Sequence, residues 1–248
     1  MYQLIIENVK DDTMAIKGAL FDLDGTLIDS MRAWNQAPIT YLAQLGIMAP
    51  DDIGDRLFAL TLEDSAEYIR KEYGPDLSAE EIADGVNGVI RQYYMTEAMP
   101  KEGAFQTLEA MYDAGIRMVI GSSTAKYLVN DVVRRLGMTR FFDAVLTCSD
   151  VGAPKSEPDL FVKAMEIMGT APEETLVVED GLYSLKEAAS LGMKTAGVYD
   201  YVSRNDRDEM MKIADIYVDE GQNLTKILKL TGGQVDPDEG FGADARLI

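Results

Sequence analysis

Short apolar runs rich in β-branched residues alternate with helix-like segments along most of this chain. The runs predict strands at 16–21, 116–120, 144–147, 175–178, 195–198 and 216–218. The segments between the later strands predict helices at 103–114, 124–136, 158–168, 182–191, 206–213 and 224–230. Strict alternation of strand and helix favours right-handed crossover connections. The sequence therefore predicts an α/β fold in which helices cover both faces of a parallel sheet.

One all-helical stretch interrupts the alternation directly after the first strand. Helices are expected at 31–46, disturbed at Pro38, and at 62–73 and 79–98, with no strand between residues 30 and 100. Such an insertion beside a strand end has the position of a lid, with hinges expected near 29–30 and 100–103. The predicted domains are a core of residues 1–30 and 100–230, a helical cap of 31–99, and a mobile Gly- and Asp-rich tail of 231–248.

The charge of the chain and its lack of histidine limit its chemistry. Its 43 acidic and 23 basic residues give a net charge of −20, which disfavours nucleic acid and anionic membranes as partners. The absence of histidine excludes Ser-His-Asp catalysis and His-based zinc sites. Cys148 is the only cysteine, and we expect it to fill the core. Without a membrane-spanning run or a signal-peptide pattern, the expected location is the cytoplasm.

Reactive side chains follow the predicted strands where each strand ends. Asp22 and Asp24 follow the first strand and precede Gly25, which permits a sharp turn. Later strand ends and the loops after them supply Ser122, Ser123, Lys155, Glu179 and Asp180. Each of these residues alone is typical of a helix cap or a solvated turn. Because parallel strands bring their carboxyl ends to one edge of the sheet, we expect the whole set to meet at one site.

These residue types fit phosphoryl transfer. Asp22, Asp180 and a backbone carbonyl near Asp24 offer the hard oxygen atoms that Mg²⁺ takes. Asp22 can then attack phosphorus to form an aspartyl-phosphate, while Asp24 protonates the leaving oxygen and later deprotonates water. Lys155 supplies positive charge for the transition state, and Ser122 with the backbone N–H groups after it can hold phosphate oxygens.

The four segments together resemble the motif set of the haloacid dehalogenase-like superfamily of phosphohydrolases. The matching segments are FDLDGTLIDS at 21–30, VIGSST at 119–124, KSEPDLF at 155–161 and VVEDG at 177–181. The resemblance covers about residues 16–230 and implies a Rossmann-like core with a helical cap. It also implies catalytic roles for Asp22 and Asp24, and a Mg²⁺ site on the side of Glu179 and Asp180. The expected metal-binding residues are Asp22, Asp24, Glu179 and Asp180, and the expected phosphate-binding residues are Ser122, Ser123 and Lys155.

Departures from the family pattern sharpen the functional hypothesis. Dehalogenases proper usually lack the second Asp of the first motif, so Asp24 argues against dehalogenation. β-Phosphoglucomutases carry a histidine in the first cap helix, and this chain has none. The first hypothesis is a Mg²⁺-dependent phosphatase acting on a small phosphorylated metabolite. The alternatives are a sugar phosphomutase similar to β-phosphoglucomutase and, from another class, a non-catalytic binding protein. The sequence leaves the substrate and the oligomeric state open.

Overall fold

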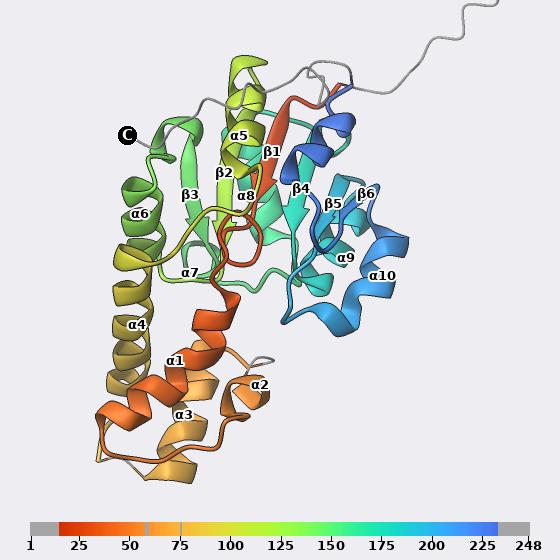
Figure 1. Cartoon of the computed structure of the whole chain (residues 1–248). Coiled ribbons are helices and arrows are strands. Elements are labelled where there is room, and N and C mark those ends of the chain that lie inside the picture. The colour runs from red at the N-terminus through yellow and green to blue at the C-terminus, as the bar shows by residue number, and fades with distance from the viewer. Residues whose placement is uncertain (1–14, 58–59, 75, 233–248) are drawn as a thin grey trace, which may run out of the picture.

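The structure is a computed structural model of the chain, and it describes residues 15–57, 60–74 and 76–232 (Figure 1). Within these residues the strands form one parallel sheet in the order β3-β2-β1-β4-β5-β6. They are β1 (Gly18–Phe21), β2 (Arg117–Ser122), β3 (Ala144–Thr147), β4 (Thr175–Glu179), β5 (Lys194–Val198) and β6 (Ile216–Val218). The predicted Rossmann-like α/β fold is confirmed. Because β1 lies between β2 and β4, the residues that follow it occupy the middle of the carboxyl edge.

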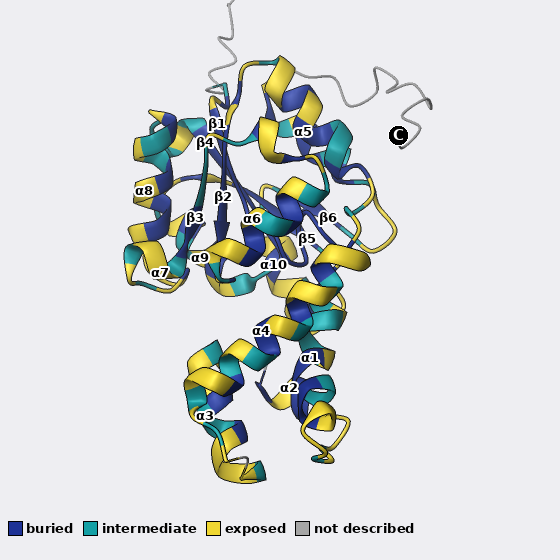
Figure 2. Cartoon of the chain, turned by 90° about the vertical axis from the view of Figure 1, so that its left-hand side faces the viewer, coloured by how far each residue is buried: buried dark blue, intermediate teal, exposed yellow. Residues whose placement is uncertain are grey.

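Helices cover both faces of this sheet. They are α5 (Ala104–Asp113), α6 (Lys126–Arg135), α8 (Asp159–Met168), α9 (Leu182–Ser190) and α10 (Arg207–Ile213). Successive strand side chains point to opposite faces, so Leu20 and Val177 pack in a cluster with α8, whereas Phe21 and Val178 pack in a cluster with α5 and α6. Figure 2 shows most of the strand residues as buried. Burial on both faces explains why the strands are continuous apolar runs.

Short helical elements fill the connections. They are η1 (Thr139–Phe141), α7 (Cys148–Val151), η2 (Pro172–Glu174), η3 (Arg204–Asp206) and η4 (Leu224–Leu230). The last of these is the helix predicted at 224–230, and it is a 3-10 helix. Its apolar residues Leu224, Ile227 and Leu230 recur every third position, and that spacing places them on one edge of a 3-10 helix.

The described residues of the inserted stretch form helices and loops but no strand. The helices are α1 (Met31–Gln44), α2 (Ile53–Leu57), α3 (Leu62–Tyr73) and α4 (Ala79–Thr96). The single helix predicted at 31–46 is found as α1, which continues through the buried Pro38. The five-residue α2 was not predicted, because such a short element shows no readable periodicity. The helices enclose apolar residues such as Leu42, Ile69 and Ile90, which are continuous with the core cluster beneath α5 and α6.

Two chain segments connect the inserted helices to the sheet, and they run side by side. Ile28 forms an antiparallel bridge with Pro100, and the Asp29 backbone N–H donates to the Met99 carbonyl at 3.0 Å. In addition, α4 lies alongside α6, where Arg91 Nε contacts Asp131 Oδ2 at 2.9 Å (Figure 1). The predicted division into core and cap, and its hinges, remain predictions, although the helices lie where that division requires them.

Some predictions fall on parts of the chain that the structure does not describe. Residues 1–14 at the start of the predicted core, and 233–248 in the predicted tail, are outside the described residues. Thr231, the first residue of that tail, is described and is buried. Among the described helices, none combines the length and apolar character that crossing a membrane requires.

Candidate active site

The loop after β1 places Asp22 and Asp24 at the centre of the carboxyl edge. The Asp22 backbone N–H donates to the Val178 carbonyl at 2.9 Å, which extends the pairing of β1 with β4 by one residue. Gly25 then takes a positive φ of 86°, a conformation that side chains disfavour. A Cβ atom at Gly25 would lie 2.2 Å from Asp180 Oδ2. Glycine is therefore required on two grounds, the turn and the close approach to Asp180.

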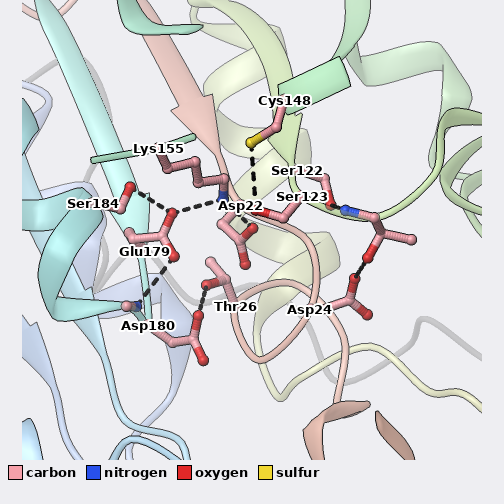
Figure 3. Close-up of polar contacts among 12 residues, drawn as sticks. Asp22, Asp24, Thr26, Ser122, Ser123, Cys148, Lys155, Glu179, Asp180 and Ser184 are labelled. Carbon is pink, nitrogen blue, oxygen red and sulfur yellow. Dashed lines mark hydrogen bonds and ion pairs between the residues drawn. The ribbon is translucent and has the colours of Figure 1, made fainter. Parts of the chain in front are cut away.

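Three buried carboxylates gather beside this loop. Asp22, Glu179 and Asp180 each offer an oxygen atom, and these atoms lie within 4.8 Å of one another. The grouping follows from the sheet, because Phe21 pairs with Val178 and the residues after both strands therefore emerge together. Figure 3 shows the three side chains converging from β1 and β4. Hard, closely spaced, buried oxygen donors suit Mg²⁺, so this donor set fits the predicted metal.

Lys155 joins two of these carboxylates. Its Nζ is 2.9 Å from Glu179 Oε2, and it also forms an ion pair with Asp22 Oδ1. The lysine is only 3 % exposed, and it comes from the loop between α7 and α8. Burial by itself lowers the pKa of Lys155, but Asp22 and Glu179 raise that pKa well above its ordinary value. Lys155 therefore remains a cation inside the site.

One lysine does not neutralise three acids. Burial, followed by the charge of Glu179, raises the pKa of Asp22 from its ordinary 3.8 to about 7. Burial and the neighbouring Asp22 also raise the pKa of Asp180 well above its ordinary value. Both shifts express the free energy of confining like charges away from water. A bound divalent cation would remove that repulsion, which is a second reason why the site fits a metal.

Asp24 lies in a different environment from Asp22. Its Oδ1 accepts hydrogen bonds from Ser30 Oγ at 2.6 Å and from the Tyr94 hydroxyl, and its Oδ2 accepts one from Thr124 Oγ1 at 2.8 Å. All three donors are neutral hydroxyl groups. Tyr94 belongs to α4 of the inserted helices, so the site includes a residue from that region. The side chain of Asp24 is not among the three clustered carboxylates, and its predicted metal contact through a backbone carbonyl remains a prediction.

The predicted phosphate-binding serines follow β2. Ser122 is buried, and its Oγ accepts a hydrogen bond from the Thr124 backbone N–H at 3.0 Å. Ser123 is exposed, and its Oγ lies 3.4 Å from Cys148 Sγ. Cys148 is partly exposed at the start of α7 instead of filling the core as expected. In Figure 3 these groups lie on the side of Asp22 opposite to Asp180. The roles assigned to both serines remain predictions.

Sequence reasoning missed several residues that support the site. Thr26, which is fully buried, donates to Asp180 Oδ1 at 3.5 Å. Ser184 in α9 donates to Glu179 Oε2 at 2.9 Å, and the Gly181 backbone N–H donates to Glu179 Oε1 at 3.1 Å. Thr26 and Ser184 stand within or directly after the motif segments, so their positions near the acids were a readable signal. Tyr94 gave no such signal, because 70 residues separate it from Asp24.

Comparison with known proteins identifies the family of the chain. Residues 19–198 match the family described as haloacid dehalogenase-like hydrolase, and this span is more than half of the chain. The chain therefore belongs to the haloacid dehalogenase-like hydrolase family. The resemblance drawn from the four sequence motifs is confirmed, and so is the prediction of a hydrolase.

Relatives and solved structures cover most of the chain. A phosphoglycolate phosphatase from Aquifex aeolicus is 28% identical, over 84% of this chain and 95% of its own length. The pyrophosphatase PpaX from Bacillus velezensis is 30% identical, over 74% of this chain and 83% of its own. The crystal structure of CbbY from Rhodobacter sphaeroides in complex with phosphate matches with a TM-score of 0.72 at 21% identity, over 82% of this chain and 93% of the other. That structural likeness supports the fold.

Proposed function

We propose that this protein is a Mg²⁺-dependent phosphatase that hydrolyses a small phosphorylated metabolite through an aspartyl-phosphate on Asp22. One observation carries the proposal. Asp22, ion-paired with Lys155, lies in a buried group of three carboxylates, while Asp24 stands apart among neutral hydroxyl donors. Two acids of one loop thus occupy the two environments that a nucleophile and an acid/base require.

The metal would be held by Asp22 and Asp180, with Glu179 and the backbone near Asp24 adjacent. When bound, Mg²⁺ supplies positive charge that offsets the repulsion between the Asp22 carboxylate and an anionic phosphate. Lys155 contributes a further positive charge beside Asp22. Ser122 and Ser123, ahead of α6, would hold the phosphate oxygens that do not take part in bond changes. This local positive charge is what draws an anion to a protein of net charge −20.

The reaction proceeds in two displacement steps at phosphorus. In the first step a carboxylate oxygen of Asp22 forms a bond to phosphorus, the bond from phosphorus to the ester oxygen breaks, and Asp24 gives that oxygen a proton. In the second step Asp24 takes a proton from water as the water oxygen attacks phosphorus. The bond between Asp22 and phosphorus then breaks and inorganic phosphate leaves. Asp24 is an acid in one step and a base in the next, so a single residue serves the whole cycle.

The comparisons support a phosphorylated substrate without fixing its identity. The relatives named above act, according to their names, on phosphoglycolate and on pyrophosphate. A relative from Thermotoga maritima, 20% identical, is called a phosphorylated carbohydrates phosphatase. Each of these names refers to small anionic phosphate compounds, and we propose a substrate of that class for this protein. The cytoplasmic location and the expectation of no nucleic-acid partner remain predictions.

A phosphate-release screen tests the proposal. The protein is assayed with Mg²⁺ against sugar, nucleotide and glycolate monophosphates and pyrophosphate, with Asp22→Asn in parallel. Release that requires both Mg²⁺ and Asp22 supports a phosphatase. Turnover of a sugar 1-phosphate that needs a bisphosphate activator and releases no phosphate would indicate a phosphomutase instead. No turnover of any compound, or equal turnover by Asp22→Asn, would revive the non-catalytic alternative.

A further inference from the structure

Tyr94 connects the inserted helices to Asp24. Its hydroxyl donates a hydrogen bond to Asp24 Oδ1 and accepts one from Trp34 Nε1 at 3.2 Å. Tyr94 lies near the end of α4, Trp34 lies in the first turn of α1, and Asp24 follows β1. Tyr94 is fully buried and is among the largest side chains that are so. A chain of contacts, Trp34 to Tyr94 to Asp24, therefore leads from two inserted helices to the core.

The hydrogen bonds of Asp24 restrict where its carboxylate can point. Ser30 and Thr124 belong to the loops at the edge of the sheet, and they hold the two oxygens from the core side. Tyr94 is the only one of the three donors that lies within a helix of the inserted stretch. Its ring is enclosed by packing, so its hydroxyl has little freedom to move. Rigid support of this kind holds an acid/base in the geometry that proton transfer needs.

We propose that Tyr94 is a positioning residue for Asp24, and that Trp34 orients Tyr94. The inference rests on the proposed function, because it concerns how the acid/base of that reaction is aimed. Tyr94 itself forms no bond to substrate and transfers no proton. It fixes the Asp24 carboxyl so that the proton reaches the leaving oxygen in the first step and is taken from water in the second.

This role has a consequence that depends on the leaving group. The leaving oxygen of an alkyl phosphate is strongly basic and needs a proton from a well-placed acid. The leaving group of an aryl phosphate such as p-nitrophenyl phosphate is a stable anion and scarcely needs that proton. Since kcat/KM reports the reaction only up to loss of the leaving group, it isolates the step in which Asp24 acts as an acid. A misplaced Asp24 therefore lowers kcat/KM for alkyl esters and spares it for aryl esters.

The test compares Tyr94→Phe with the wild type on glycerol phosphate and on p-nitrophenyl phosphate. We expect kcat/KM for glycerol phosphate to fall about 10- to 100-fold, as for a small misplacement of a catalytic group. For p-nitrophenyl phosphate the fall should be about threefold or less. The matched control is Tyr93→Phe, which removes the neighbouring hydroxyl, a donor to the Asp29 carbonyl at 2.8 Å, without touching Asp24. This control should leave the ratio of the two substrates unchanged.

A second variant keeps the inference testable if Tyr94→Phe does not fold. Trp34→Phe removes the hydrogen bond to the Tyr94 hydroxyl while the contact between Tyr94 and Asp24 remains possible. We expect the same selectivity for the alkyl ester with a smaller loss, about three- to tenfold, in keeping with one neutral hydrogen bond. Equal losses on both substrates, or no loss on either, in whichever variant folds, would overturn the proposed role of Tyr94.

The outcomes separate this inference from the proposed function. If Asp22→Asn abolishes turnover but neither the Tyr94 nor the Trp34 variant discriminates between the two esters, the phosphatase stands and the positioning role falls. If Asp22→Asn leaves turnover unchanged, the proposed mechanism itself fails, and the positioning role of Tyr94 fails with it.

Discussion

Asp22 and Asp24 stand two residues apart on one loop, yet their surroundings differ in kind. Asp22 is surrounded by charges: Glu179, Asp180 and the ammonium group of Lys155. Asp24 accepts hydrogen bonds from three neutral hydroxyl groups and, among the described residues, takes part in no ion pair. The difference shows how a single strand end supplies two chemical roles. In the proposed mechanism, the charged environment would prepare Asp22 for a metal and an anionic substrate, and the hydroxyl donors would hold Asp24 for proton transfer.

Replacing Asp22 should produce the largest effect. Asp22→Asn keeps the size of the side chain but removes the anionic oxygen that attacks phosphorus, so phosphate release should fall about 10⁴-fold or more. The measurement is release of inorganic phosphate with Mg²⁺ on the best substrate from the screen. Circular dichroism serves as the control for folding. Retention of a tenth of the wild-type rate would show that Asp22 is not the nucleophile.

Replacing Asp24 should give a smaller and different loss. Asp24→Asn removes the proton donor and acceptor but leaves the nucleophile, so phosphate release should fall about 10²- to 10⁴-fold. Because the second step needs a base, phosphorylated protein should accumulate when p-nitrophenyl phosphate is the substrate. A burst of nitrophenol in rapid mixing reports that accumulation. If Asp22→Asn and Asp24→Asn behaved alike on this substrate, the contrast between the two acids would be lost.

The next largest effect should come from Ser184 in α9, which donates to Glu179 of the three clustered carboxylates. Ser184→Ala removes the hydrogen bond to Glu179 Oε2, and loss of such an outer partner typically weakens metal binding about 10-fold or somewhat more. Titration of activity with Mg²⁺ measures this affinity. The control is Ser190→Ala in the same helix, because Ser190 is exposed and its hydroxyl donates to the Glu187 carbonyl, away from the clustered carboxylates. Equal Mg²⁺ affinities for both variants would remove Glu179 from the metal site.

The burial of Asp22, together with the charges around it, should also affect the stability of the metal-free protein. The pKa of Asp22 is about 7 in the folded protein, against its ordinary 3.8 in the unfolded chain. Between these pH values Asp22 therefore holds a proton only in the folded state. The stability from that proton is complete below about pH 4 and is lost as the pH rises through about 7. Asp22→Asn has no such proton to lose.

The variant and the wild type can therefore be compared in urea with a chelator present. The free energy of unfolding of Asp22→Asn, relative to the wild type, should rise between about pH 4 and pH 7 by an amount on the order of a few kcal/mol, and then level off. A difference that stays constant across this range would mean that burial and the neighbouring charges do not raise the pKa of Asp22 as described.

Much of the sheet and of the site was predictable, because most of the site residues directly follow or end strands that can be recognised in the sequence. The β-branched runs that end in Asp22, Ser122 and Glu179 give both the sheet and the site, since parallel strands share a carboxyl edge. The acids, Lys155 and the serines were placed in this way. The five-residue α2 was not predicted, because so short a helix shows no readable periodicity, whereas the single helix expected at 31–46 is found as α1.

The partners of Asp24 show what local reasoning cannot reach. Thr124 lies within the VIGSST segment that follows β2, but nothing near Tyr94 in the sequence marks Tyr94 as part of a site. Its place depends on how α4 packs against the core, which is a property of tertiary packing and not of any motif. The sequence therefore predicted the charged residues around Asp22 more completely than the hydroxyl donors to Asp24.

Locating the phosphoryl group tests the account most directly. Asp24→Asn, mixed with Mg²⁺ and p-nitrophenyl phosphate and then quenched in acid, should carry one phosphoryl group, and peptide fragmentation should place it on Asp22. A phosphoryl group on any other residue, or none at all while nitrophenol is still released, would contradict the assignment of Asp22 as the nucleophile beside the metal group.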